Sequence, residues 1–435
     1  MNPTTGAPDL VGKRPNLLVN RNFALLFTGL SISSIGDMVF DTTLIVWIAL
    51  GLARGQSWAP LAVSGVLIAA AIPTAVVGAV AGVFVDRWDK RQTMLAMDAT
   101  RAVVVALLVL ATGAVPLPFV AGGALPLAWR LGAIYITVFF VNALGRFFGP
   151  ASSALVGDLV READRTRASG LQQSATNLAL VIGTALAPPL YLAFGPQWAL
   201  LINAASFAVS FACVRAIIAP PPARSVAAGQ RGNFAGEFGA GLRFFARSRV
   251  LMTLAIALML VMLGGGALNA LDVFFATRNL HASATIYGLM DAAFGAGAII
   301  GAIVLSTLAR RVRAARMAWG GLLVLGLLII VYSRLTSPLA AVALLFVVGI
   351  FNAAINVAVG PLMLHVTPRE LRGRVSALLN PLTALASLVS LALAGVLAST
   401  LLRGLHADVL GFTFGPIDTI MFAAGVLVVL GGVYT

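Results

Sequence analysis

Charged residues, histidine and cysteine are all scarce in this chain. Only 10% of its 435 residues are charged, three are histidine, and Cys213 is the single cysteine. One cysteine excludes an internal disulfide, and no two histidines stand at the spacing of metal ligands. The sequence also lacks a phosphate-binding loop and any Ser-His-Asp or paired-carboxylate set within a loop. These absences argue against metal sites, cofactors and ATP hydrolysis, and leave a membrane-embedded enzyme of lipid metabolism as a remote alternative.

Long apolar stretches dominate the chain instead. Its residues are 60% hydrophobic, and a membrane-spanning helix needs about 20 mainly apolar residues. The pattern predicts an all-α membrane protein with twelve transmembrane helices in two pseudo-symmetric six-helix bundles. The predicted spans cover residues 22–50, 60–85, 92–113, 130–157, 168–194, 197–218, 249–276, 284–308, 316–334, 337–365, 372–401 and 415–435.

The distribution of basic residues predicts the orientation. If alternate connections lie on alternate sides, 22 of the 29 Lys and Arg residues fall on the side of the N-terminus. Loops on the cytoplasmic side carry this excess, so both termini are expected in the cytoplasm. The net charge of +14 is scattered between apolar runs, which argues against nucleic-acid binding.

A polar segment divides the chain in the middle. We expect a cytoplasmic tail over residues 1–21, a first bundle over 22–218, a linker over 219–248 and a second bundle over 249–435. The linker begins with a Pro-, Gly- and Ser-rich stretch that is typical of flexible connectors. Its later part repeats apolar residues at helical spacing, which indicates an amphipathic helix on the inner membrane face.

The two halves also repeat each other. Residues 78–94 align with 301–317, and residues 159–171 resemble 366–378. Both matches fall in equivalent cytoplasmic loops. Parallel six-span repeats of this kind are typical of one transporter plan.

A charged loop between the second and third spans carries a family resemblance. Gly82, Asp86, Arg87, Lys90 and Arg91 resemble the loop signature of the major facilitator superfamily. Three stretches further resemble the branch that contains macrolide-efflux proteins and the enterobactin exporter: residues 20–44, 146–173 and 366–382. The resemblance implies a secondary active transporter in which two bundles rock about a central cavity.

The same resemblance implies a cytoplasmic latch in this loop. Asp86 is expected near the N-terminus of the eleventh span, where unpaired amides favour an anion. Arg87 is expected to pair with Asp158 at the end of the fourth span, while Lys90 and Arg91 complete the cluster. The alternative is that the loop only fixes topology, which two basic residues alone could do.

Ionisable residues inside the spans are candidates for energy coupling, because a charge at bilayer depth is costly unless it is paired or hydrated. Asp37 and Asp41 lie one turn apart in the first span, and Arg146 lies in the fourth. In the superfamily plan these spans line the cavity, which would bring Asp37 and Arg146 together. We expect Asp37, with Asp41, to exchange protons. A permanent ion pair and simple cavity polarity remain alternatives.

Other charged residues within spans have less specific interpretations. Asp98 and Arg101 stand three residues apart, which favours a local ion pair near the interface. Asp272 and Asp291 lie in the outer thirds of their spans and could form an outer gate, line the cavity or reach the interface.

The substrate cavity is expected to be mostly apolar with a few polar groups, which suits bulky lipophilic molecules. The candidate lining residues are Phe40, Asn142, Phe147, Asn269, Asp272, Phe351, Asn352 and Asn356. Any of the amides could instead hydrogen-bond helices together.

The sequence therefore predicts a monomeric, proton-coupled exporter of lipophilic drug-like or siderophore-like molecules in the bacterial inner membrane. Its expected partners are that substrate, protons and membrane lipids. A flippase for a lipid or lysolipid remains the main alternative, since it would use a similar cavity.

Overall fold

The computed structural model describes residues 19–85, 87–114, 125–218, 245, 248–308, 314–366, 372–405, 407–409 and 412–434. Asp86, most of the predicted N-terminal tail and nearly all of the predicted linker with its amphipathic helix lie outside these residues.

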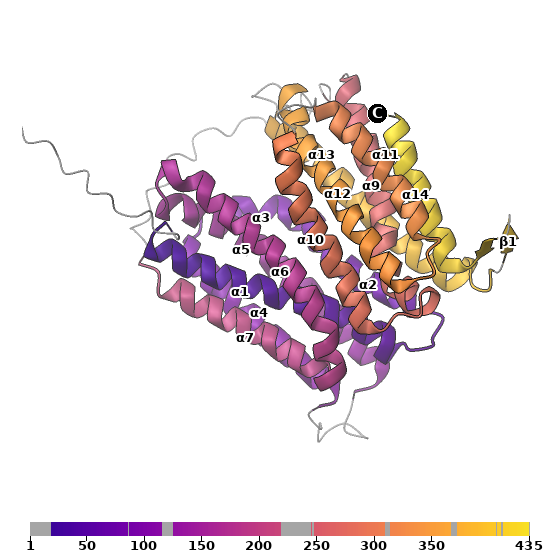
Figure 1. Ribbon diagram of the computed structural model, residues 1–435. Helices are drawn as coiled ribbons and strands as arrows, with labels where there is room; N and C mark the ends of the chain where they lie inside the picture. Colours follow the sequence, from indigo (N-terminus) through magenta and orange to yellow (C-terminus); the bar gives the residue numbers. More distant parts are fainter. Residues whose placement is uncertain are drawn as a thin grey trace, which may run out of the picture.

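Thirteen α-helices in the described part of the chain form two bundles (Figure 1). The first bundle contains α1 (Arg21–Val46), α2 (Ala59–Val76), α3 (Gly78–Val85), α4 (Lys90–Leu108), α5 (Leu127–Leu159), α6 (Arg165–Phe194) and α7 (Pro196–Arg215). The second bundle contains α9 (Arg249–Phe274), α10 (Ala284–Leu308), α11 (Ala314–Tyr332), α12 (Pro338–Val366), α13 (Arg372–Val396) and α14 (Pro416–Tyr434).

Short elements extend or join these helices. Wider π-helical turns continue α1, α9 and α13, as η1 (Trp47–Leu52), η4 (Phe275–Asn279) and η6 (Leu397–Leu401). Within the described ranges, two 3₁₀ turns are η2 (Val109–Thr112) and η3 (Glu162–Asp164). An antiparallel hairpin of β1 (Ala407–Val409) and β2 (Phe412–Phe414) precedes α14.

The helices have the length and composition of membrane spans. Among the described residues, eleven helical segments are long and apolar enough to cross a membrane, and Arg316–Tyr332 of α11 is a shorter apolar segment. With α2 and α3 counted as one span, these segments correspond to the twelve predicted spans. The predicted fold class of two six-span bundles is confirmed.

Polar side chains cap the starts of α1 and α4 at one end of the first bundle. The Asn20 side chain accepts from the Phe23 amide at 2.8 Å and donates to the Leu159 carbonyl at 2.7 Å. This residue therefore satisfies a free amide at the start of α1 and ties that start to the end of α5. Asp89 caps α4 in the same way, accepting from the Gln92 amide at 2.7 Å.

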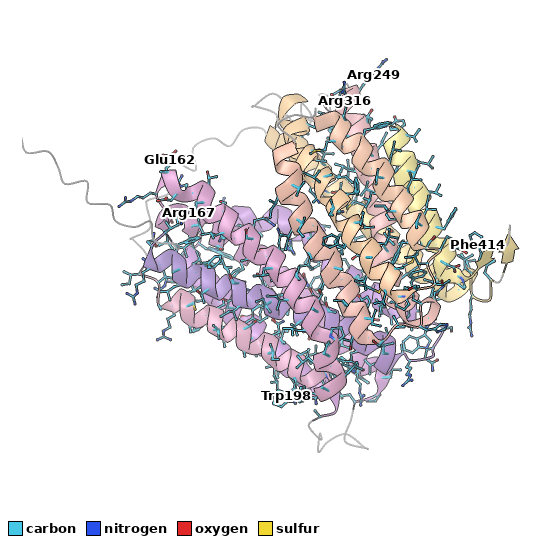
Figure 2. The ribbon with its side chains drawn as sticks, in the orientation of Figure 1. Glu162, Arg167, Trp198, Arg249, Arg316 and Phe414 are labelled. Carbon is cyan, nitrogen blue, oxygen red and sulfur yellow. The ribbon has the colours of Figure 1, made fainter. Side chains whose placement is uncertain are left out.

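We call the end that carries these caps the basic end, because Arg21, Lys90, Arg215, Arg249 and Arg316 all lie there. The opposite end is the far end. In Figure 2, Glu162 and Arg167 mark the basic end of the first bundle, and Arg249 and Arg316 mark that of the second. Trp198 and Phe414 mark the far end.

The two bundles pack against each other at the far end. Gly288 of α10 faces α6 so closely that a Cβ there would lie 2.7 Å from Pro188 Cγ. This contact of α6 with α10 is one seam between the bundles. At a second seam, the Leu61 amide of α2 donates to Ser399 Oγ of η6 at 3.1 Å. The largest hydrophobic cluster includes residues of both bundles, such as Val63 and Tyr287.

The basic ends of the bundles have separate cores. Phe23, Met94 and Phe148 belong to one cluster, whose members all lie in the first bundle. Leu251 and Val375 belong to another, which lies in the second half of the chain. The structure is thus joined at the far end, and its two halves diverge toward the basic end (Figure 1).

Candidate functional site

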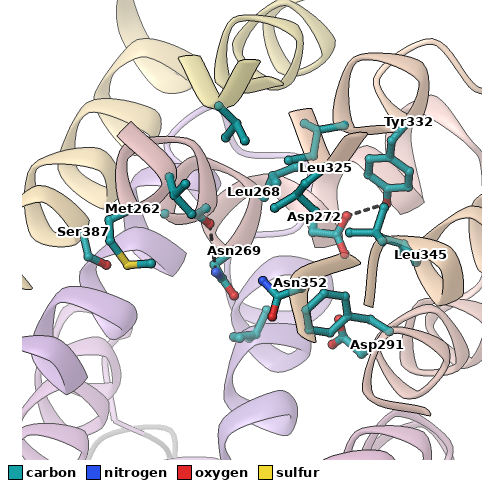
Figure 3. A pocket seen from close by; sticks show the side chains of 18 of the residues that line it. Met262, Leu268, Asn269, Asp272, Asp291, Leu325, Tyr332, Leu345, Asn352 and Ser387 are labelled. Carbon is teal, nitrogen blue, oxygen red and sulfur yellow. Dashed lines mark hydrogen bonds between the residues drawn. The ribbon is translucent and has the colours of Figure 1, made fainter. Parts of the chain in front are cut away.

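A cavity of about 310 Å³ lies in the second bundle (Figure 3). Its walls are largely aliphatic and aromatic, and Ile45 of α1 contributes from the first bundle. The polar lining residues are Asn269, Asp272, Tyr287, Asp291, Tyr332, Asn352 and Ser387. A mostly apolar pocket with a few polar groups is what a small-molecule site requires.

Two carboxylates and two tyrosines from three helices meet in this cavity. The Tyr332 hydroxyl of α11 donates to Asp272 Oδ1 of α9 at 2.5 Å. Tyr287 and Asp291 stand one turn apart on α10, and their side chains interact. Asp272 and Asp291 are close enough to influence each other electrostatically. The lining includes no Lys or Arg. The site can therefore accept positive charge or protons.

Three of the predicted cavity residues come together here: Asn269, Asp272 and Asn352 all line the cavity. Asp291 does so too, in agreement with one of its three interpretations. Asn269 also donates to the Gly265 carbonyl of its own helix at 2.8 Å. Asn356 lies one turn beyond Asn352 and donates to its carbonyl and side-chain oxygens at 3.1 Å.

The two tyrosines were not predicted. The i, i+4 spacing of Tyr287 and Asp291 could have indicated their contact. Tyr332 is 60 residues from Asp272, and no sequence spacing relates the two.

The other predicted cavity residues have different surroundings. Phe40 is 1% exposed and belongs to the hydrophobic core. Phe147 stacks on Trp88 with ring centroids 5.9 Å apart. Asn142 donates to the Val138 carbonyl of its own helix at 2.9 Å. Neither these three nor Phe351 lines the cavity in the second bundle.

Asp37 lies in a buried polar cluster of the first bundle. Its neighbours are Asn203 on α7 and the charged pair Asp98 and Arg101 on α4. The close packing depends on Gly36, since a Cβ there would lie 2.2 Å from Ser206 Oγ.

The expected contact between Asp37 and Arg146 is not formed in this conformation. The cation that acts on Asp37 is Arg101, and Arg146 lies beside Gly78 of α3. Asp41 lies close enough to Asp37 for their charges to interact. Which way each side chain faces depends on helix rotation and packing, which the spacing of these residues did not reveal.

The predicted pair of Asp98 and Arg101 is confirmed, with a distance of 2.5 Å. It is buried rather than interfacial, since the two side chains are 0% and 6% exposed. The Arg101 guanidinium also lies over the rings of Phe148 and Phe207, at 4.6 and 4.3 Å from their centroids.

The charged loop has a different pairing from the one expected. Lys90, not Arg87, lies 2.7 Å from Asp158, while Arg87 is exposed. Arg91 donates to the carbonyls of Val214 and Arg215 at the end of α7. Gly82 lies in α3, and the expected contact of Asp86 with the eleventh span falls outside the described residues.

Comparison with known proteins identifies the family. The profile of the transmembrane secretion effector family, within the major facilitator superfamily, matches residues 16–415. The chain belongs to this family. It is a transporter of the major facilitator superfamily and not an enzyme.

Several curated relatives of this transporter have efflux names. The multidrug efflux pump Tap of Mycobacterium tuberculosis is 26% identical over 78% of this chain and 79% of its own length. The macrolide efflux protein A of Streptococcus pyogenes is 22% identical over 65% of both chains. The uncharacterized MFS-type transporter YkuC of Bacillus subtilis is 23% identical over 94% of this chain and 92% of its own length.

Solved structures show the same fold. A bacterial homologue of the lysosomal transporter Spinster, in an inward-facing and unoccupied conformation, has a TM-score of 0.71 at 15% identity. The match covers 97% of both chains. A bacterial homologue of the iron transporter ferroportin, inward-facing, has a TM-score of 0.70 at 13% identity and covers 95% of this chain and 97% of its own.

Proposed function

We propose that this transporter exports lipophilic small molecules in exchange for protons, by rocking its two bundles about the central region. The observation that carries the proposal is the apolar cavity with two carboxylates and no basic lining residue. The names of the relatives macrolide efflux protein A and multidrug efflux pump Tap support export of drug-like molecules.

The shape and the charge distribution are compatible with export, which the names of the relatives suggest. We assign the basic end to the cytoplasm, because connections rich in Lys and Arg stay on that side. The bundles diverge at this end and pack together at the far end, so this conformation would receive substrate from the cytoplasm. Parting of the two far-end seams would then release it outside.

Asp37 and Asp41 are the proposed proton-coupling residues in the first bundle. A carboxylate at this depth gains or loses a proton when its hydration changes, and rocking changes hydration. In this conformation the cation that acts on Asp37 is Arg101. A contact with Arg146 in the opposite conformation remains a prediction.

Transport into proteoliposomes under an imposed pH gradient tests the proposal. The substrates would be a macrolide, tetraphenylphosphonium and a lysolipid, each with and without a protonophore. We expect gradient-driven accumulation of the first two, and loss of the gradient dependence in Asp37→Asn. Glu162→Gln removes an exposed carboxylate from η3 and serves as the matched control.

Two results would contradict the proposal. One is proton dependence that is unchanged in Asp37→Asn, which would contradict the coupling role of Asp37. The other is movement of the lysolipid alone without any gradient dependence, which would indicate a flippase.

A further inference from the structure

Among the residues that the structure describes, no cation compensates the carboxylates of the cavity. The groups that act on Asp272 and Asp291 are each other and the hydroxyls of Tyr287 and Tyr332. The helices α12, α13 and α14, and Ile45 of α1, contribute no charged residue to the lining. The nearby Arg278 is directed elsewhere, since it lies over the Phe274 ring at 4.9 Å and donates to the Gln56 carbonyl at 3.4 Å.

Near the far end of this bundle, another carboxylate and another cation already form an ion pair with each other. Arg334 lies 2.9 Å from Asp418, and its guanidinium also lies over the Phe414 ring. Neither residue lines the cavity. A carboxylate within an apolar region must be protonated or must acquire a cation, because an isolated buried charge is strongly unfavourable. Both acids of the cavity therefore require positive charge from protons or from a ligand.

The walls indicate which kind of cation fits. Aliphatic side chains and Phe294 surround the acids, and the faces of Tyr287 and Tyr332 can stabilise a cation further. A metal ion is disfavoured, since the described residues hold no group of three or more His, Cys, Asp and Glu side chains suited to one. An organic cation matches this lining, because its apolar body replaces water along the walls while its charge meets the carboxylates.

We propose that Asp272 and Asp291 form the binding site for amphipathic organic monocations, which displace protons from this pair of carboxylates. The inference rests on the proposed function and names the substrate class of the exporter. Tyr332 orients Asp272 through its hydrogen bond, and Tyr287 faces Asp291 in the same way. The amides of Asn269 and Asn352 supply neutral hydrogen-bonding groups to the rest of the substrate.

The site also lies beside the seam that must open. Gly288 stands between Tyr287 and Asp291 on α10 and packs against Pro188 of α6. A change in the charge of Asp291 therefore occurs within one helical turn of a contact between the bundles. Binding at this carboxylate can thus favour one conformation over the other, provided that the cation interacts differently with the two.

Equilibrium binding to the purified full-length protein tests this site without transport. The probe is radiolabelled tetraphenylphosphonium, and tetraphenylborate has the same shape with the opposite charge. We expect the dissociation constant for tetraphenylphosphonium to rise at least tenfold in Asp291→Asn and in Asp272→Asn. It should stay unchanged in Glu162→Gln. Lowering the pH should weaken binding to the wild type, and the double Asn variant should lose this pH dependence.

Further variants separate binding from folding. Asp291→Glu retains the carboxylate and should bind more tightly than Asp291→Asn, whereas a folding defect would affect both alike. Tetraphenylborate should not compete with the probe. Unchanged affinity in both Asn variants, or no binding by the wild type at pH 8, would overturn the inference. Proton-driven transport of a neutral macrolide would still support the proposed function in that case.

Discussion

Arg101 donates to Asp98 at 2.5 Å inside the first bundle, between the rings of Phe148 and Phe207. The pair is buried, and Asp37 lies within reach of its charges. Desolvation of two charges offsets much of the attraction between them. Because Asp37 is a second carboxylate beside this pair, loss of Arg101 would leave two buried carboxylates without that cation.

Removal of one partner of this pair should destabilise the protein strongly. In Arg101→Met the Asp98 carboxylate stays buried without its cation, and we expect a loss of about 3–5 kcal/mol. The double variant Asp98→Asn with Arg101→Met should recover part of that loss, because Asp98 no longer carries a charge, while the carboxylate of Asp37 still lacks Arg101. Unfolding of the purified protein by denaturant, followed by circular dichroism, measures both effects. Equal losses of unfolding free energy in the single and double variants would mean that the broken ion pair is not the cause of the destabilisation.

Lys90 and Arg91 are neighbours in the charged loop but should differ in their effect on stability. Lys90 forms an ion pair with Asp158 in which the side chains are 36% and 39% exposed. Such surface pairs contribute only about 0–1 kcal/mol. Arg91 instead donates to two carbonyls at the end of α7, and hydrogen bonds from charged groups contribute about 1.5–3 kcal/mol.

We therefore expect Arg91→Gln to lower the unfolding midpoint more than Lys90→Gln does. Added salt should reduce the small effect of Lys90→Gln and leave that of Arg91→Gln largely unchanged, because close and partly buried contacts are less screened. The same denaturant experiment, carried out at low and at high salt, measures the effects of both substitutions on the unfolding midpoint. A larger effect for Lys90→Gln would show that the loop stabilises mainly through its contact with α5.

Arg334 connects α11 to the start of α14. Its guanidinium lies 2.9 Å from Asp418 and 4.2 Å from the centroid of Phe414, while Asp418 also accepts from the Gly415 amide at 2.9 Å. Lysine would keep the charge but lose the planar group that stacks on the ring. We expect Arg334→Lys to lower the free energy of unfolding by about 1–2 kcal/mol, within the range measured for cation–π contacts. Phe414→Leu should cost a similar amount, and the two changes together should cost less than their sum.

The spans could be predicted because the bilayer imposes a simple rule on the backbone. Every amide and carbonyl within the membrane must be bonded inside its own helix, so each span appears as a long apolar run. The location of α1 or α10 therefore follows from local composition. The alternation of basic residues along the chain then predicts which connections lie on the same side of the membrane. This prediction requires no information on how the helices pack.

The contacts between side chains of different helices could not be predicted, since they depend on how each helix is rotated. Asp37 was expected to meet Arg146 from the superfamily plan, but Gly36 brings α7 close and the cluster forms with Arg101 instead. The contact of Tyr332 with Asp272 likewise joins residues that no local pattern relates. Asn352 lines the cavity, as expected of a polar group in an apolar span, whereas Asn142 of α5 instead bonds within its own helix.

Gly288 should control the closure of the far end. A Cβ at this position would lie 2.7 Å from both Pro188 Cγ and the Thr184 carbonyl oxygen of α6. Overpacking of this kind costs about 1–3 kcal/mol, and the bundles can relieve it by separating along the seam. A change of this size corresponds to a shift of about 5- to 150-fold in a conformational equilibrium.

We therefore expect Gly288→Val to favour the conformation that is open at the far end. Spin labels on cysteines introduced at Gln56 and Arg278, in a Cys213→Ala background, would report the separation across this end, because these two residues are in contact in the closed form. The distance distribution should move to longer values in Gly288→Val. Gly132→Val is the matched control, since a Cβ at Gly132 would meet nothing within 4 Å. An unchanged distribution in Gly288→Val would mean that α6 and α10 are not a moving seam.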